Sequence, residues 1–384
     1  MERAPSRARV ALVHCPSYEA AEVRQAVDRG IDLLGGIQRF VQSGERLVLK
    51  PNLLAGRAPE HAVTTHPSVF GAVADAFRDH GASLTYGDSP GFGNPQTIAR
   101  RAGLAQAAGR RGIPLAEFSR GTERAFEEGR LIKRFTIAAG VLAADGIVSL
   151  PKMKTHGLTR ITGAIKNQFG CIPGPLKAEF HARLPNADLF SRMLVDLNRL
   201  LRPRLFVLDG VVAMEGNGPQ SGTPRPMQVL LLSEDPVALD ATFCRLVHLD
   251  PTLVLPIVYG QEVGLGQAID IDLVGDSPEA FAASDFRVNR SPRSTSGAPG
   301  RVSRLARWLV VPKPTIVPSR CTRCGTCVAA CPVTPKAVQF DRDRPGDPPV
   351  HHYARCIRCY CCQEMCPERA IDITVPALGR WIHR

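Results

Sequence analysis

Cysteines near the C-terminal end of the chain are spaced like the ligands of iron–sulfur clusters. They form two runs of the pattern Cys-x2-Cys-x2-Cys-x3-Cys-Pro, which span residues 321–332 and 356–367. A [4Fe–4S] cube needs one thiolate for each iron, and the two-residue gaps place three sulfurs around one cube within a single tight loop. The tandem runs therefore predict two [4Fe–4S] clusters. A pair of structural zinc sites is the alternative, but such sites favour two Cys-x2-Cys pairs.

The region 312–376 resembles the two-cluster bacterial-type ferredoxin domain, in which the fourth cysteine of each run binds the other cube. The additional Cys361 lies beside Cys362, and we interpret it as a spare thiol that faces away from the cube. The predicted ligands of the first cluster are Cys321, Cys324, Cys327 and Cys366, and those of the second are Cys356, Cys359, Cys362 and Cys331.

The length of the chain and the positions of its cysteines limit the class of protein to which it can belong. The chain has 384 residues, which is enough for two domains, and its hydrophobic content of 44% is normal for a globular protein with a core. Nine of the 12 cysteines fall between residues 321 and 366, so they are ligand candidates and not a disulfide framework. Residues 1–10 are charged and no long apolar run follows, so we expect a soluble cytoplasmic protein without a signal peptide.

The net charge of +12 is concentrated before the cysteine runs. Residues 287–320 contain eight Lys or Arg and no acidic residue, together with Ser, Pro and Gly. We interpret this stretch as a solvated basic linker, with docking to an acidic electron carrier or to a membrane surface as alternatives. Nucleic-acid binding ranks last because aromatic residues for base stacking are not interleaved with the charges. The expected domains are 1–285, a linker 286–311, the ferredoxin-like domain 312–376 and a tail 377–384.

Upstream of the linker, apolar strand-like runs alternate with segments of helical periodicity. This alternation predicts an α/β domain with a largely parallel sheet and flanking helices, and the C-terminal region adds a small ferredoxin-like α+β domain. The expected strands cover 9–14, 46–50, 83–86, 132–137, 146–150, 204–208 and 228–232, and the expected helices cover 18–34, 66–80, 95–110, 189–201 and 237–247.

Polar clusters follow several of these strands, where sites of open α/β sheets gather. Cationic and amide side chains there suit a ligand with carboxylate or phosphate groups, although each of them could instead be a cap or a solvated surface residue. His156 is the candidate proton donor because imidazole titrates near neutral pH, and Asp88 and Glu215 are weaker acid–base candidates. The predicted substrate-binding residues are Lys50, Asn52, Lys152, Lys154, Lys166 and Asn167.

The segment 152–156 carries three of these candidates at alternate positions. If it stays extended after Pro151, its two lysines and its histidine face one way. We expect these side chains to lie outside the core, beside one another, and to hold a single anion.

The ordered set of motifs resembles the family called domain of unknown function 362, over roughly residues 8–275. The motifs are Lys50-Pro51-Asn52, Gly87-Asp88-Ser89-Pro90-Gly91, Lys152-x-Lys154-x-His156-Gly157, Gly163-Ala164-x-Lys166-Asn167-x-x-Gly170, Asp209-Gly210, Glu215-Gly216-x-Gly218-Pro219 and Asp235-Pro236-x-Ala238-x-Asp240. The resemblance implies an α/β domain joined to a redox module and supplies no settled reaction.

From these observations we expect an iron–sulfur redox enzyme. Its two clusters would pass single electrons from a carrier, such as a ferredoxin or flavodoxin, to an anionic small molecule in the α/β domain. The alternative is a non-catalytic electron-transfer or assembly protein whose α/β domain binds a partner. No Walker loop and no early Gly-x-Gly-x-x-Gly after a strand is present, so neither ATP nor NAD is predicted.

Overall fold

A largely parallel sheet forms the centre of the protein. The computed structural model describes residues 7–91, 93–291, 311–341, 343–344 and 346–376, and among these the main sheet has nine strands. Its order is β11-β1-β10-β9-β6-β2-β3, with β7 beside β9 and β8 beside β7. The strands are β1 (Ala8–His14), β2 (Arg46–Pro51), β3 (Ser83–Tyr86), β6 (Gly146–Leu150), β7 (Lys152–His156), β8 (Arg160–Thr162), β9 (Leu205–Glu215), β10 (Thr223–Ser233) and β11 (Ile271–Gly275).

Strands β3, β2, β6 and β9 run parallel, and β10 then joins antiparallel between β9 and β1. Alternate residues of β2 enter two different cores: Leu47 and Leu49 face one way and Val48 faces the other. Burial on both faces is the reason why these strands read as continuous apolar runs. The predicted fold class is confirmed.

Helices cover both faces of the sheet. On one face lie α1 (Ala20–Leu33), α2 (Pro67–Asp79), α3 (Pro95–Arg101) and α4 (Leu104–Gly109). The other face is covered by α6 (Ala164–Asn167), α8 (Ala187–Leu201), α9 (Pro236–Leu246) and α10 (Leu255–Glu262). The remaining elements of this domain are α5 (Ala139–Leu142), α7 (Gly174–Arg183) and the hairpin of β4 (Gly121–Ala125) and β5 (Arg134–Ala138).

Local chemistry explains where the helices begin and break. Asn186 accepts a hydrogen bond from the backbone N–H of Leu189, so α8 begins two residues before the expected position. The single helix expected over 95–110 is instead two helices. Gly103 adopts a φ of 74° between them, a left-handed conformation that interrupts a helix and that glycine adopts without strain.

The segment Lys152–His156 differs from its prediction. It is a strand, β7, which pairs with the long strand β9 beyond the end of β6 and with β8 in a hairpin. Lys152, Lys154 and His156 are at most 4% exposed, so the expectation that they lie outside the core is wrong. Strand β9 has 11 residues and is long enough to pair with both β6 and β7 in turn.

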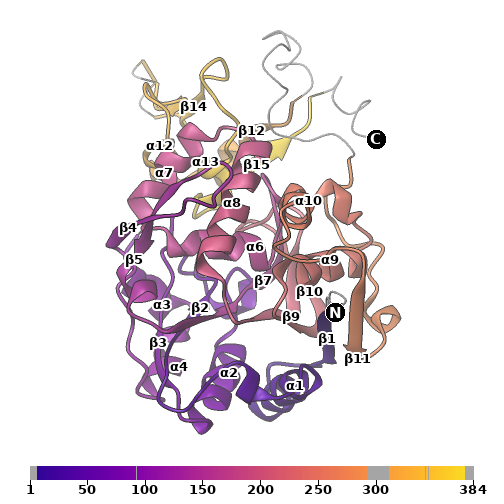
Figure 1. Ribbon diagram of the computed structural model, residues 1–384. Helices are drawn as coiled ribbons and strands as arrows, with labels where there is room; N and C mark the ends of the chain where they lie inside the picture. The colour runs from indigo at the N-terminus through magenta and orange to yellow at the C-terminus, as the bar shows by residue number, and fades with distance from the viewer. Residues whose placement is uncertain (1–6, 92, 292–310, 342, 345, 377–384) are drawn as a thin grey trace.

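The cysteine-rich segment lies beyond α7 and α8, at the end of the molecule opposite α1 and α2 (Figure 1). Its described residues form two short sheets and two four-residue helices. Gln363 donates from Nε2 to Asn217 Oδ1 at 2.8 Å, and Gln220 donates to the carbonyl of Cys366 at 3.2 Å, so this segment is bonded to the α/β domain. Its elements are β12 (Lys313–Ile316), β13 (Val338–Gln339), β14 (Val350–His351), β15 (Ile371–Thr374), α12 (Thr326–Ala329) and α13 (Cys361–Glu364).

The first residues of the expected linker pack on the α/β domain. Phe286 is fully buried, and the Arg287 guanidinium contacts the Glu215 carboxylate at 2.8 Å. Residues 286–291 are therefore attached to the α/β domain by a core side chain and an ion pair, although Arg287, Asn289 and Arg290 are exposed. Residues 292–310 and the expected tail 377–384 lie outside the described part of the chain.

Candidate functional site

The cysteines of the two runs gather in two groups. A small cavity in the C-terminal segment is lined by four of them, Cys321, Cys324, Cys327 and Cys366. Burial raises the pKa of the Cys327 thiol to about 11, and the other three thiols of the group add to this effect because they lie close by. Cys324 is exposed, so this group reaches the surface.

The second group surrounds Cys362. Burial raises the pKa of its thiol well above the ordinary value, and the neighbouring thiols that contribute are Cys359, Cys356 and Cys331, with Cys327 of the first group also near. Backbone N–H groups point at two cysteine sulfurs: Ala337 donates to Cys331 at 3.3 Å and Ala370 donates to Cys366 at 3.2 Å. Free thiols that gather in this way, with N–H donors aimed at two of the sulfurs, have the chemistry that cluster ligands need, although no three of the described His, Cys, Asp or Glu side chains are arranged to hold a single metal ion. The crossed ligand assignment stays a prediction.

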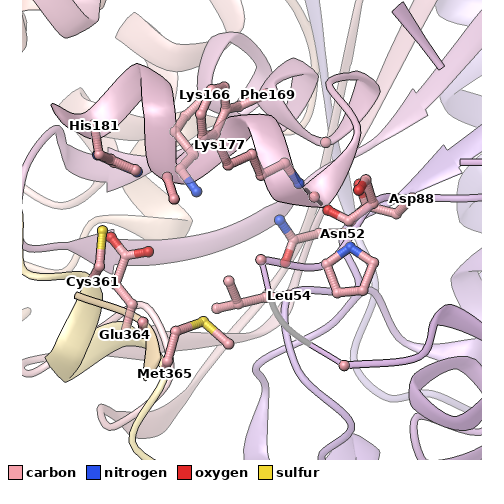
Figure 2. A pocket seen from close by; sticks show the side chains of 18 of the residues that line it. Asn52, Leu54, Asp88, Lys166, Phe169, Lys177, His181, Cys361, Glu364 and Met365 are labelled. Atoms are coloured by element: carbon pink, nitrogen blue, oxygen red, sulfur yellow. Dashed lines mark hydrogen bonds between the residues drawn. The ribbon is translucent and has the colours of Figure 1, made fainter. Parts of the chain in front are cut away.

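A cavity of about 380 Å³ lies between the α/β domain and the cysteine-rich segment. Figure 2 shows Cys361, Glu364 and Met365 on the side of the C-terminal segment, across from Asn52 and Asp88. Cys361 and Ala330 are chain neighbours of Cys362 and Cys331, so the cavity borders the second cysteine group. Its principal polar lining residues are Asn52, Asp88, Ser89, Lys166, Asn167, Lys177, His181 and Glu364.

Lys50 and Asp88 form a buried ion pair at the floor of this cavity. Their charged atoms are 2.9 Å apart, and Lys50 also donates to Asn167 Oδ1 at 3.0 Å. Gly170 passes so close that a Cβ there would collide with both charged groups, which explains the need for glycine. Lys50 does not line the cavity, whereas Asp88 and Asn167 do. The positive charge of Lys50 is therefore already matched within the protein.

Lys152 has a similar internal partner. Its ammonium lies 2.7 Å from the Asp209 carboxylate and donates to the hydroxyl of Tyr18 at 2.8 Å. Lys152 is 1% exposed and does not line the cavity. Its geometry is that of a structural ion pair beneath the site.

Lys154 does not line the cavity and reaches its wall through Asn52. It donates to Asn52 Oδ1 at 2.8 Å and to the carbonyl of Val63 at 2.6 Å, and among the described residues no carboxylate lies within ion-pair distance of it. Burial lowers its pKa well below the usual value. The two lysines of β7 thus reach different partners and do not converge on one anion.

Two other lysines do face the cavity. Lys166, at the end of α6, points its ammonium toward the interior, and Lys177 extends from α7 to the carbonyl of Ser89 (Figure 2). Burial lowers the pKa of Lys177 to about 7. No carboxylate within the described chain lies at ion-pair distance from either ammonium.

His156 contacts the cysteine-rich segment and not the cavity. Its Nε2 lies 3.0 Å from Glu364 Oε1. Its Nδ1 accepts backbone N–H bonds from Leu158 at 3.0 Å and Thr159 at 3.3 Å, so the ring proton belongs on Nε2. Burial lowers the pKa of His156. Burial alone would raise the pKa of Glu364, but the nearby His156, Lys166 and His181 outweigh this effect and lower its pKa to about 2. Both directions fit a neutral imidazole beside an ionised carboxylate.

Another imidazole, His181 of α7, lines the cavity. It stacks on Phe190 with ring centroids 4.7 Å apart, and its Nδ1 is buried without a hydrogen-bond partner among the described residues. Burial lowers its pKa to about 4, so the ring is neutral at pH 7.

Of the three predicted acid–base residues, only Asp88 lines the cavity. Asp88 also accepts the Leu53 N–H at 2.8 Å, so both of its oxygens have partners. Glu215 lies at the end of β9 and is held by Arg287. The predicted set Lys50, Asn52, Asp88, Lys154 and Asn167 forms one network, whereas Glu215 stands apart from it.

Sequence reasoning missed Lys177, His181, Glu364 and the position of Cys361. Glu364 falls within the three-residue gap between Cys362 and Cys366, which marks it as close to the clusters but not as part of a cavity. Lys177 and His181 are four residues apart and hence share one face of α7. Nothing in the sequence indicates which neighbour that face meets.

Comparison with known proteins identifies the family. The family model described as "Domain of unknown function (DUF362)" matches residues 47–245. The chain belongs to this family. The description "4Fe-4S dicluster domain" matches residues 313–367, so this DUF362 protein is also an iron–sulfur electron-transfer protein.

The comparisons also found two similar proteins. "Thylakoid-associated protein sll1697" from Synechocystis is 34% identical over 299 residues, which cover 74% of this chain and 92% of the relative. A solved structure from Thermotoga maritima has 12% sequence identity and a TM-score of 0.35, with 58% of this chain and 57% of that chain covered. Within the described residues, helices are too short or too polar to cross a bilayer.

Proposed function

We propose that this protein is an oxidoreductase that delivers single electrons to an anionic small molecule bound in the cavity between its two parts. The observation that carries the proposal is the composition of the cavity wall. One side offers Lys166 and Lys177, and the opposite side is built from the immediate chain neighbours of Cys362 and Cys331. When bound, [4Fe–4S] clusters supply electrons one at a time.

The residues of this chain bind and orient the anion. Lys166 and Lys177 supply the positive charge, and the Asn52 and Asn167 amides lie on the same wall. Asp88 holds Lys50 and the chain at Leu53, so its role is to shape the floor. His156 contacts Glu364 and does not reach the cavity, so it does not fill the proton-donor role expected for it. Lys177 takes that role in this proposal, because burial lowers its pKa to about 7 and it lines the cavity.

The two cysteine groups suggest the direction from which electrons arrive. Cys324 is exposed in the first group, whereas the second group borders the cavity. A carrier such as a ferredoxin or flavodoxin would dock at the exposed Cys324 side.

Anaerobic purification followed by mass spectrometry of co-purified small molecules tests the proposal. The parent protein is expected to carry an anion that the Lys166→Met variant lacks and that the exposed control variant Lys133→Met retains. After reduction with dithionite, the identified anion is expected to reoxidise the visible absorbance of the parent. An anion that binds without reoxidation would instead support the non-catalytic alternative.

Cellular location is a separate proposal. The name of the Synechocystis relative associates that protein with thylakoids. For this chain we retain a cytoplasmic location, and cell fractionation tests it. Recovery in the membrane fraction with release by high salt would instead indicate contact of the basic residues 287–320 with a membrane surface.

A further inference from the structure

The charges around the cavity do not balance. Five lysines gather at this end of the sheet, namely Lys50, Lys152, Lys154, Lys166 and Lys177, and the carboxylates among them are Asp88, Asp209 and Glu364. Asp88 and Asp209 are matched to Lys50 and Lys152, and Glu364 faces His156. Counted over these side chains alone, with every group ionised and before any cluster is added, five positive charges meet three negative ones, which leaves an excess of two.

A buried excess of positive charge is removed in one of two ways. Either ammonium groups lose protons, or an anion enters. The lysines concerned are Lys154, Lys166 and Lys177, for which the described residues provide no carboxylate within ion-pair distance. Two of these three, Lys166 and Lys177, line the cavity itself.

Lys177 is the cavity lysine whose environment disfavours its charge most clearly. It is 8% exposed, its acceptor is the Ser89 carbonyl, and Lys166 of α6 and Lys50 of β2 add like charge. Asp88 is the acidic group that opposes them. Burial lowers the pKa of Lys177 to about 7, so the empty cavity holds this side chain as a mixture of amine and ammonium near neutral pH.

We propose that the cavity is selective for dianions and that Lys177 takes up a proton when the dianion binds. This rests on the anion cavity of the proposed function and adds the charge of its ligand. An ammonium next to a bound anion is favoured over an amine, so occupancy raises the pKa of Lys177. Below pH 7 the lysine is already protonated and binding is independent of pH. Above pH 7 binding requires proton uptake, and the affinity falls by about tenfold per pH unit.

Other titratable groups face the same space from each adjoining element. They are Lys166 on α6, Asp88 after β3, Lys50 on β2, Cys171 in the 3-10 turn Gln168–Cys171, His181 on α7, and Cys361 and Glu364 on α13. The pKa values of His181 at about 4, Glu364 at about 2 and Cys171 at about 12 lie outside the range from pH 6 to 9. Lys154 lies behind the cavity wall and also has a lowered pKa, so its contribution must be separated from that of Lys177.

Calorimetric titration with sodium sulfate tests the inference on the cluster-loaded protein. Sulfate is a suitable probe because it remains a dianion over the whole range from pH 6 to 9, and sodium nitrate is its monoanionic control. We expect sulfate to bind on the order of tenfold more tightly than nitrate. We also expect the sulfate affinity to be constant at and below pH 6.5 and to fall by about tenfold between pH 7.5 and 8.5.

Three variants test whether Lys177 is the residue that takes up the proton when sulfate binds. Lys177→Arg keeps a positive charge at every pH used, so it is expected to bind sulfate with an affinity that does not change from pH 6 to 9. Lys154→Met is expected to keep the pH dependence, and Lys166→Met to weaken sulfate binding at every pH.

Each contrary result has a distinct meaning. Sulfate binding that is pH-independent in the parent, or a pH dependence that survives in Lys177→Arg, overturns the proton uptake by Lys177. Equal affinity for nitrate and sulfate overturns the dianion selectivity. Absence of any sulfate binding overturns the anion cavity as well, whereas the electron-transfer part of the proposed function is judged by reoxidation of the reduced protein.

Discussion

The α/β domain and the cysteine-rich segment bury cores of different composition. The α/β domain packs large aliphatic and aromatic side chains on both faces of its sheet, such as Phe70, Phe77, Phe190 and Phe206. The fully buried part of the C-terminal core consists of Cys327, Cys331, Cys362 and Cys366 with four small or aliphatic residues. The first core is large enough to be stable through hydrophobic burial, whereas we expect the second, which is small, to need metal clusters to stay folded.

The cavity inherits both properties. Its floor and one wall come from the α/β domain, and Cys361, Glu364 and Met365 come from the cysteine-rich segment. If that segment folds only around its clusters, we expect the proposed ligand site to be complete only in the cluster-loaded protein.

Removal of iron should produce the largest effect and separates the two parts. Anaerobically reconstituted protein is expected to hold about eight irons, and chelation is expected to unfold residues 311–376 while the α/β domain remains folded. Hydrogen exchange followed by mass spectrometry measures both regions in one sample. Protection of the C-terminal segment after complete iron loss would show that its small apolar core suffices. Two zinc ions per chain and no iron would end the redox proposal.

Loss of one ligand tests how the two cysteine groups are divided. Cys321→Ser and Cys366→Ser are expected to damage the same cluster, although they lie in different runs, because both side chains line one small cavity. Electron paramagnetic resonance of the reduced variants distinguishes the two clusters by their spectra. If each variant loses a different signal, the crossed ligand sets are wrong.

Lys152, which forms a buried ion pair, and Lys166, which faces the cavity, should respond differently to substitution. Lys152→Met leaves the buried Asp209 without its cation, which is expected to lower the free energy of unfolding of the α/β domain by about 3–5 kcal/mol. Replacing both partners, as in Lys152→Met with Asp209→Leu, is expected to recover much of this loss. Lys166→Met removes an ammonium for which the described residues offer no ion-pair partner, and it is expected to change stability by less than about 1 kcal/mol. Denaturant unfolding measures all three, and equal losses for Lys152 and Lys166 would contradict the distinction.

Cys361→Ala should produce the smallest effect. Cys361 lines the cavity and Cys362 completes the ligand spacing, so the variant is expected to keep its full iron content. Cys362→Ala is the matched control and is expected to lose one cluster. Loss of about half the iron from the Cys361 variant, with none from the control, would show that the two neighbours have been assigned the wrong way round.

Much of this protein could be predicted from local patterns. The spacing within each cysteine run indicates cluster ligands because three thiols must meet within one loop, a constraint of short range. The runs at 46–50 and 146–150 are parallel strands. They could be predicted because a strand that is buried on both faces has apolar residues in succession and not in alternation. The helix starts at Asn186 and Asp235 follow from side chains that accept the first free backbone N–H groups.

The roles of the charged residues were decided by the tertiary structure. Lys50, Lys152 and Lys166 are alike in the sequence, yet the first two meet Asp88 and Asp209 inside the fold and the third faces a cavity. His156 meets a carboxylate 208 positions away in the chain, because the cysteine-rich segment packs against β7. The ionisation and the role of a buried charged group depend on the groups that contact it. When those groups are distant in sequence, the packing of whole helices and strands brings them together, and a local sequence pattern does not predict that packing.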